Sequence, residues 1–133
     1  MTGYGYNYQY LSPFSTFDYV TPMPPNLSEV SEPARTVAFG TSAELNTWSF
    51  ATPTVEGNPF LDPPSSAFPG FQGRHNGFGN VLWCDGHVKT FKPIYRTGTF
   101  GYGYNAADFS KVQLGDIDQD GNLATDELFS LEK

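Results

Sequence analysis

The stretch NVLWCDGHVKTF, residues 80–91, decides the fold because it has the pattern of two short antiparallel β-strands joined by a tight turn. Residues that favour strands stand on both sides of the dipeptide Asp85-Gly86. Asp-Gly is typical of the two-residue type I′ turn of β-hairpins, which places Cys84 opposite His87. This register turns one face of the hairpin toward the core. The core-facing residues are predicted to be Val81, Trp83, Val88 and Thr90.

Four more segments are predicted to be strands around this hairpin. They are residues 3–11 (GYGYNYQYL), 36–40 (TVAFG), 46–51 (NTWSFA) and 95–104 (YRTGTFGYGY). In the first of them, small or polar residues alternate with tyrosine, which is the period of a strand with one aromatic face. Proline-rich segments separate the strands, and proline cannot donate to a central ladder. The predicted fold class is mainly β with a minor α component, an antiparallel sheet with long Pro/Gly-rich loops.

Charge and composition narrow the classes of partner. The formal net charge is −7, and no run of Lys or Arg provides a phosphate-binding track. An acidic chain of this kind repels nucleic acid and anionic lipid, so neither is expected as a partner. No apolar run in the sequence is long enough to span a bilayer. The single cysteine, Cys84, excludes an internal disulfide framework and a Cys-rich zinc site and is expected to be a small buried hydrophobe.

Residues 116–127, DIDQDGNLATDE, match the pattern of an EF-hand calcium loop. Calcium takes six to eight oxygen ligands, and Gly121 permits the sharp turn that brings them together. A water is expected where Ala124 offers no ligand atom, and Leu123 is expected to point into the core. Without a cation, the clustered carboxylates would repel one another. The predicted ligands are the side chains of Asp116, Asp118, Asp120 and Glu127 and the backbone carbonyl of Asn122.

Short helices are expected on both sides of this loop, one from Asn105 to about Val112 and one from Thr125 onward. The chain of 133 residues is then a single domain, with a β-rich head over residues 1–104 and a helix–calcium loop–helix unit over residues 105–133. A lone loop of this kind at a chain end favours structural calcium over calcium signalling, because regulatory sensors generally pair two loops.

A second motif lies in residues 73–89, where His75 is followed, after nine residues, by Asp85-Gly86. The pattern resembles the H-X9-DG motif of prepilin-type (pseudopilin-like) proteins of planctomycete type. Residues 4–7 (YGYN) and 31–40 (SEPARTVAFG) are similar to two further segments of that family. The resemblance thus covers about residues 3–92. It implies a pilin-like antiparallel sheet head that is exported and assembled outside the cytoplasmic membrane.

The same resemblance implies features that this sequence lacks. Members of the family carry a cleaved leader and a long apolar helix that forms the filament core, and neither is present in residues 1–133. Type II secretion pseudopilins, in turn, carry structural calcium in their C-terminal loops, which agrees with the acidic loop. His75, Asp85 and Gly86 are predicted to have a structural role. A metal or acid–base role for His75 is the alternative, although no serine nucleophile motif accompanies it.

The sequence therefore predicts a structural subunit of an extracellular filament or surface assembly, stabilised by calcium, rather than an enzyme. Its partners would be copies of itself in a homopolymer, located outside the cell or at the cell surface. A neighbouring subunit would add a strand to the N-terminal edge. That assembly edge is formed by Tyr4, Tyr6, Tyr8 and Tyr10. The alternative is a secreted module for carbohydrate binding or adhesion that uses aromatic rings such as Trp48 as stacking platforms.

Overall fold

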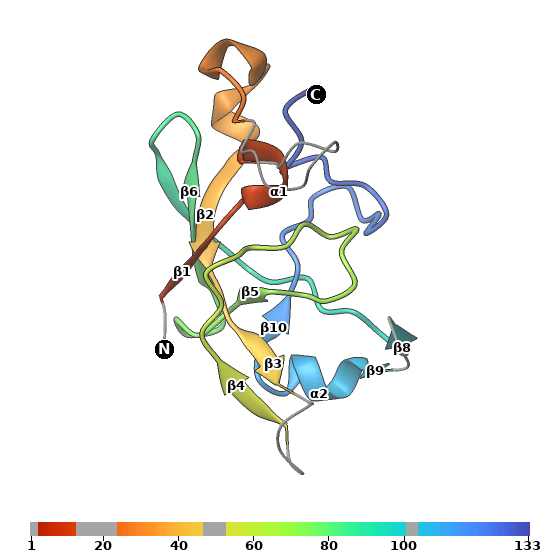
Figure 1. Ribbon diagram of the computed structural model, residues 1–133. Coiled ribbons are helices and arrows are strands. Elements are labelled where there is room, and N and C mark those ends of the chain that lie inside the picture. Colours follow the sequence, from red (N-terminus) through yellow and green to blue (C-terminus); the bar gives the residue numbers. More distant parts are fainter. Residues whose placement is uncertain (1–2, 13–23, 47–52, 101–103) are drawn as a thin grey trace.

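The computed structural model describes residues 3–12, 24–46, 53–100 and 104–133 (Figure 1). Within these ranges the chain is mainly β, with antiparallel sheets and two short α-helices, which confirms the predicted fold class. In Figure 1, α1 and the C-terminal segment lie toward one end of the molecule, and α2 with β8 and β9 lies toward the other. No helix in the described part of the chain is long and apolar enough to cross a membrane.

A four-stranded antiparallel sheet organises the molecule, with strand order β1-β2-β6-β7. Its strands are β1 (Tyr4–Tyr6), β2 (Val37–Thr41), β6 (Gly79–Trp83) and β7 (Val88–Phe91). Two-stranded sheets join β3 (Glu44–Asn46) to β4 (Thr54–Glu56), β5 (Phe71–Gln72) to β10 (Leu114–Gly115), and β8 (Thr99–Phe100) to β9 (Tyr104–Asn105). The helices are α1 (Tyr8–Leu11), α2 (Ala106–Ser110) and the 3-10 turns η1 (Leu27–Glu29) and η2 (Pro33–Arg35).

The core lies on one face of the four-stranded sheet. Alternate residues of a strand point to opposite faces, so β6 buries Val81 and Trp83 while Leu82 lies on the other face. Residues of β5 and of the C-terminal part of the chain, from residue 117 onward, complete this core. Its buried members are Val37, Leu61, Phe71, Val81, Trp83, Ile117, Leu128 and Phe129. A smaller cluster of Ala43, Phe109 and Leu114 lies beside α2.

The hairpin forms where the sequence predicts it, but the predicted turn is wrong. The backbone N–H of Gly86 donates to the carbonyl of Trp83 at 2.9 Å, and that of Trp83 donates to the carbonyl of His87 at 3.0 Å. A type I′ turn needs positive φ at both central residues, but of Asp85 and Gly86 only Gly86 has it, at +95°. The connection is therefore a three-residue loop rather than a type I′ turn. Leu82 therefore pairs with Val88, one residue away from the predicted register. Val88 is 62% exposed instead of facing the core, and Thr90 is also exposed.

A type I′ turn does occur, nine residues earlier in the chain, at Asn76-Gly77. Both residues have positive φ, +59° and +89°. The backbone N–H groups of His75 and Phe78 each donate to the other's carbonyl, at 2.9 and 3.1 Å. Asn-Gly suits this turn because both residues tolerate the left-handed conformation. This turn reverses the chain before β6, whereas the loop with Asp85 and Gly86 follows β6.

The N-terminal strand β1 is only three residues long, so the predicted strand over residues 3–11 is wrong beyond Tyr6. Asn7 is fully buried, and its Nδ2 donates to the carbonyl of Val37 at 2.8 Å and to that of Phe129 at 3.1 Å. Because of these two bonds, Asn7 does not continue β1, and α1 begins at the next residue, Tyr8. A buried amide that pairs with backbone distant in the sequence thus overrides the local alternation.

The other strand predictions have mixed outcomes. The segment 36–40 is confirmed as β2. Of the segment 46–51, Asn46 ends β3, and the remainder lies outside the described residues. The segment 95–104 contains only the short strands β8 and β9, with residues 101–103 outside the described part.

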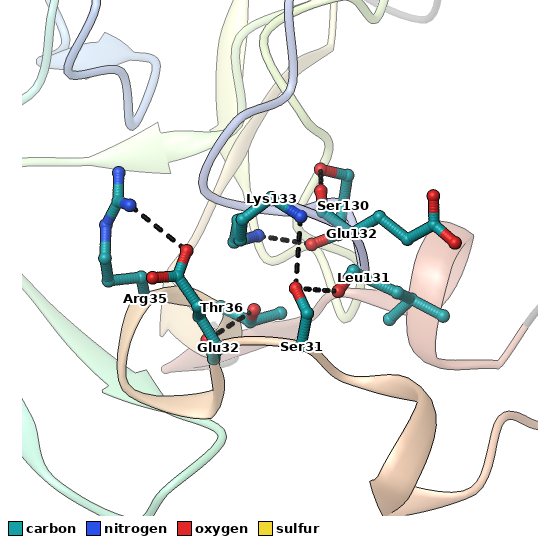
Figure 2. A network of polar contacts seen from close by, with 8 residues as sticks. All are labelled: Ser31, Glu32, Arg35, Thr36, Ser130, Leu131, Glu132 and Lys133. Atoms are coloured by element: carbon teal, nitrogen blue, oxygen red, sulfur yellow. Dashed lines mark hydrogen bonds and ion pairs between the residues drawn. The ribbon is translucent and has the colours of Figure 1, made fainter.

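The C-terminal segment, residues 128–133, is hydrogen-bonded to Ser31, two residues before η2, and to the start of β2 (Figure 2). The backbone N–H and Oγ of Ser31 donate to the carbonyl of Leu131 at 2.9 and 3.0 Å, and the N–H of Lys133 donates to Ser31 Oγ at 3.0 Å. Val37 N–H donates to the carbonyl of Leu128 at 2.8 Å. These bonds fix the chain directly after the acidic loop.

The outer edge of β1 is covered rather than free. The N–H of Tyr6 donates to the carbonyl of Pro59, and the N–H of Leu61 donates to the carbonyl of Tyr6, both at 2.9 Å. The close approach depends on Gly5, since a Cβ there would lie 2.7 Å from the carbonyl carbon of Phe60.

We therefore expect Gly5→Ala to lower the free energy of unfolding by about 1–3 kcal/mol, because the added methyl separates β1 from residues 59–61. Gly3→Ala is the matched control, since a Cβ at Gly3 meets nothing within 4 Å. Urea denaturation of both variants measures the difference. Equal midpoints would show that β1 does not need this contact.

Candidate metal centre

The acidic loop, residues 116–127, begins directly after β10 rather than after a helix. The N–H groups of Asp116 and Ile94 each donate to the other's carbonyl at 2.9 Å, so the start of the loop is anchored to a neighbouring segment. The predicted upstream helix exists as α2, and the Oδ1 of Asn105 accepts the N–H of Ala107 at 3.0 Å at its start. However, β10 separates α2 from the loop.

The predicted helix after the loop does not form, so the helix–loop–helix prediction is wrong on this side. Residues from Thr125 onward make one hydrogen-bonded turn, in which the N–H of Ser130 donates to the carbonyl of Asp126 at 2.9 Å. The carbonyls of Leu128 and Leu131 accept from Val37 and Ser31 instead. Tertiary partners thus take the acceptors that a helix would use.

Three carboxylates of the loop converge. Asp118, Asp120 and Glu127 each offer an oxygen, and these atoms lie within 4.8 Å of one another. Backbone amides orient two of them, since Gly121 N–H donates to Asp118 Oδ2 at 3.0 Å and Gln119 N–H donates to Glu127 Oε1 at 2.8 Å. The turn depends on the positive φ of Gly121, +80°, as the sequence predicts. The cluster can hold a metal ion.

Asp118 is the most deeply buried of the three converging carboxylates. It is 4% exposed, and its Oδ1 is buried without a hydrogen-bond partner among the described residues. Burial, with the nearby Glu127 carboxylate, raises the pKa of Asp118 to about 6. A buried carboxylate oxygen without a partner is costly, and a bound cation would remove that cost. Hard oxygen donors of this type suit calcium or magnesium.

The other predicted loop positions are engaged differently. The backbone carbonyl of Asn122, a predicted ligand, accepts the N–H of Thr125 at 3.0 Å and its Oγ1 at 2.8 Å. Leu123 is half-buried and belongs to neither core cluster, so the prediction that it points into the core is wrong. It lines a surface hollow together with Arg96 and Phe100.

Asp116 lies outside the converging group. Its carboxylate is fully buried against Arg96, whose Nε donates to Oδ2 at 2.8 Å and whose Nη2 donates to Oδ1 at 3.0 Å. Arg96 was not singled out by the sequence, where it stands in a predicted strand. The one feature of the sequence that could have indicated its role is its residue type, because arginine is the cation best suited to buried bidentate pairs.

Asp126, also not predicted as functional, joins the loop to the N-terminal segment. Its Oδ2 accepts from Tyr10 Oη and from Ser65 Oγ, both at 2.7 Å, and its Oδ1 accepts the N–H of Ser65 at 2.9 Å. Burial, together with this carboxylate, raises the pKa of Tyr10 to about 12. The residue before Glu127 is therefore held from two sides.

The histidine motif does not form a joint site. His75 lies in the turn before β6 and is exposed, whereas Asp85 lies in the loop after β6. Asp85 Oδ1 instead accepts the N–H of His87 at 3.1 Å and bonds its ring Nδ1, and these bonds lower the pKa of Asp85. Cys84 is half-buried, and burial raises the pKa of its thiol. Gly86 supplies the left-handed turn position.

The four tyrosines of the predicted assembly edge do not share one edge. Tyr4 and Tyr6 belong to β1, and the Tyr6 ring packs on Phe39 with centroids 4.9 Å apart. Tyr8 and Tyr10 belong to α1, where Tyr10 is directed to the acidic loop. Only the β1 pair remains on the sheet.

The chain was also compared with known proteins. No protein-family model, no curated protein and no solved structure matches it. The resemblance to pseudopilin-like proteins thus stays a prediction, and the function has to be inferred from the geometry of the described residues.

Proposed function

We propose that this protein is a non-enzymatic structural subunit that assembles with copies of itself outside the cell, and that one calcium ion stabilises its C-terminal loop. The observation that carries the proposal is an apolar surface on the outer face of the four-stranded sheet, opposite the core. This outer face is hollowed by about 350 Å³ and lined by Tyr4, Phe39, Asn80, Leu82 and Val88.

The outer face is suited to a protein partner. Val88 is 62% exposed, and Tyr4 and Phe39 are also exposed. Contiguous apolar patches on soluble proteins commonly mark interaction sites. The outer face continues to β7, which ends the strand order and has exposed residues at Val88, Lys89 and Thr90. The unpaired backbone groups of an edge strand can pair with another copy.

Calcium fits the same function. The converging oxygens of Asp118, Asp120 and Glu127 form a hard, anionic ligand set. Asp126 bonds Tyr10 of α1, and the C-terminal segment that follows the loop bonds Ser31 and also Val37 of β2. An ion in the loop would therefore stabilise its contacts with these N-terminal residues. Calcium is abundant outside the cell, which agrees with an extracellular or cell-surface location.

Negative-stain electron microscopy in millimolar calcium, and again after chelation, tests the proposal. The unaltered protein is expected to form regular filaments or tubes that fray when calcium is removed. Val88→Glu is expected to abolish them, because it places a charge in the outer face. Leu27→Glu is the matched control: Leu27 is 72% exposed but lies in η1, away from the sheet strands, so its filaments should persist.

Dispersed particles of the unaltered protein under both conditions would contradict the proposal. The alternative function, a carbohydrate-binding or adhesion module, is favoured by one feature of the same surface, where Asn80 Nδ2 donates to Tyr4 Oη at 3.3 Å beside exposed rings. Saturable binding of a sugar to the monomer, and its loss in the variant Phe39→Ala, would establish this alternative. Trp48, the platform expected from the sequence, lies outside the described residues.

A further inference from the structure

We propose that Asp116 is not a ligand of the bound ion, and that Arg96 holds this carboxylate whether or not the loop is loaded. The metal site is then built on Asp118, Asp120 and Glu127, with water and backbone oxygens completing the sphere. This inference rests on the calcium-binding part of the proposed function. It assigns Asp116 to the scaffold of the loop, although Asp116 stands at the first ligand position of the sequence pattern.

The first argument is how completely Arg96 is bonded. Besides its two bonds to Asp116, its Nη2 donates to the carbonyls of Pro64 at 3.0 Å and Ser66 at 3.1 Å, and its Nη1 donates to that of Ala67 at 3.2 Å. The Arg96 side chain is 10% exposed and that of Asp116 is 0% exposed. If the ion bound the Asp116 carboxylate, the nearly buried guanidinium of Arg96 would lose its negatively charged partner, and such a loss is costly.

The second argument is that the backbone of Asp116 cannot move toward the cluster. Its N–H and carbonyl both pair with Ile94 at 2.9 Å. Gly115 packs so closely on the same segment that a Cβ there would lie 2.6 Å from the carbonyl oxygen of Ile94. On the other side, Ile117 is 1% exposed within the main core. Both neighbours of Asp116 are therefore held in place.

The third argument is that the converging group is already oriented without Asp116. Asp118 Oδ2 accepts from Gly121, and Glu127 Oε1 accepts from Gln119. Asp118 Oδ1 is the buried oxygen that has no partner among the described residues. A cation at the point where Asp118, Asp120 and Glu127 meet would satisfy that oxygen, whereas Asp116 needs no further partner.

A ligand set of three carboxylates has a consequence for affinity. The affinity of calcium loops rises with the number of charged ligands and with the rigidity of the site. Removing one carboxylate and placing a guanidinium beside the loop should weaken binding to the range of extracellular modules, a dissociation constant of about 10⁻⁴–10⁻³ M. The loop would then be filled only where calcium is plentiful.

Calorimetric titration with calcium tests the ligand set on two isosteric variants. Asp118→Asn is expected to weaken calcium binding by about 10-fold or more, because it removes the charge of a direct ligand. Asp116→Asn is expected to change the dissociation constant by less than about 3-fold, although it lowers the melting temperature of the calcium-free protein. A loss with Asp116→Asn as large as that with Asp118→Asn would overturn the inference.

A measurement on the unaltered protein covers the case in which Asp116→Asn fails to fold. The Nε–H resonance of Arg96 in a ¹⁵N-labelled sample is expected to keep its position and its slow exchange with water when calcium is added. A calcium-induced shift to the position of a free arginine would show that the ion displaces Arg96. Failure of the unaltered protein to bind calcium would refute the proposed calcium site itself, and binding without filaments would refute only the assembly.

Discussion

Replacing Arg96 with methionine is expected to lower the free energy of unfolding of the calcium-free protein by about 3–5 kcal/mol, because the variant leaves the Asp116 carboxylate buried without its counter-charge. Methionine keeps much of the apolar volume of the arginine stem, so the loss reports mainly on the ion pair and on the three carbonyls that Arg96 binds. Urea denaturation monitored by tryptophan fluorescence measures it.

Two comparisons make this result specific. Arg35→Met removes an exposed pair, in which Nη1 lies 3.2 Å from Glu32 Oε2, and should cost no more than about 1 kcal/mol. The double variant with Arg96→Met and Asp116→Leu should recover much of the loss, since apolar pairs often replace buried ion pairs without penalty. If Arg96→Met and Arg35→Met cost the same, the Arg96 pair contributes little to stability.

Phe129→Ala is expected to have an effect of similar size, a loss of about 3–5 kcal/mol, since it opens a cavity in the core. Phe129 is fully buried, and it is the largest side chain that the C-terminal segment contributes to the core cluster. Its carbonyl remains available to Asn7, so the loss reports on the ring.

Thermal and urea unfolding of Phe129→Ala should be compared with that of Phe78→Ala. The ring of Phe78 is exposed at the turn before β6, and its removal should change stability little. Calcium affinity is expected to fall as well in Phe129→Ala, because the proposed ligand Glu127 lies two residues earlier in the chain. An unchanged stability would mean that the C-terminal segment is not part of the folding unit.

The parts of the fold that local sequence determines were predictable. Residue types located β2 and the hairpin strands, whose identity does not depend on distant contacts. The register was not predictable from Asp85-Gly86, because the same dipeptide serves a two-residue turn or the end of a three-residue loop. Only the structure shows that Gly86 takes positive φ and Asp85 does not.

The candidate site divides in the same way. Asp118, Asp120 and Glu127 belong to one short loop, so their spacing alone brought them together in the prediction. The placement of Asp116 depends on Arg96, 20 residues away, and that of Asp126 depends on Tyr10, 116 residues away. No local pattern carries such information. The same limit hid the covered edge of β1, where residues 59–61 pair with Tyr6.

The side chain of Asn7 has a consequence for how the protein folds. It bonds residues 30 and 122 positions further along the chain, so the core depends on contacts between segments that are far apart in the sequence. Chains rich in such long-range contacts fold slowly, on a scale of about milliseconds to seconds, because loop-closure entropy is lost before the contacts form. During synthesis, the bond from Asn7 to the carbonyl of Phe129 can form only once residue 129 has left the ribosome. We therefore expect the core to close only after residues 1–129 have been synthesised, rather than segment by segment as the chain grows.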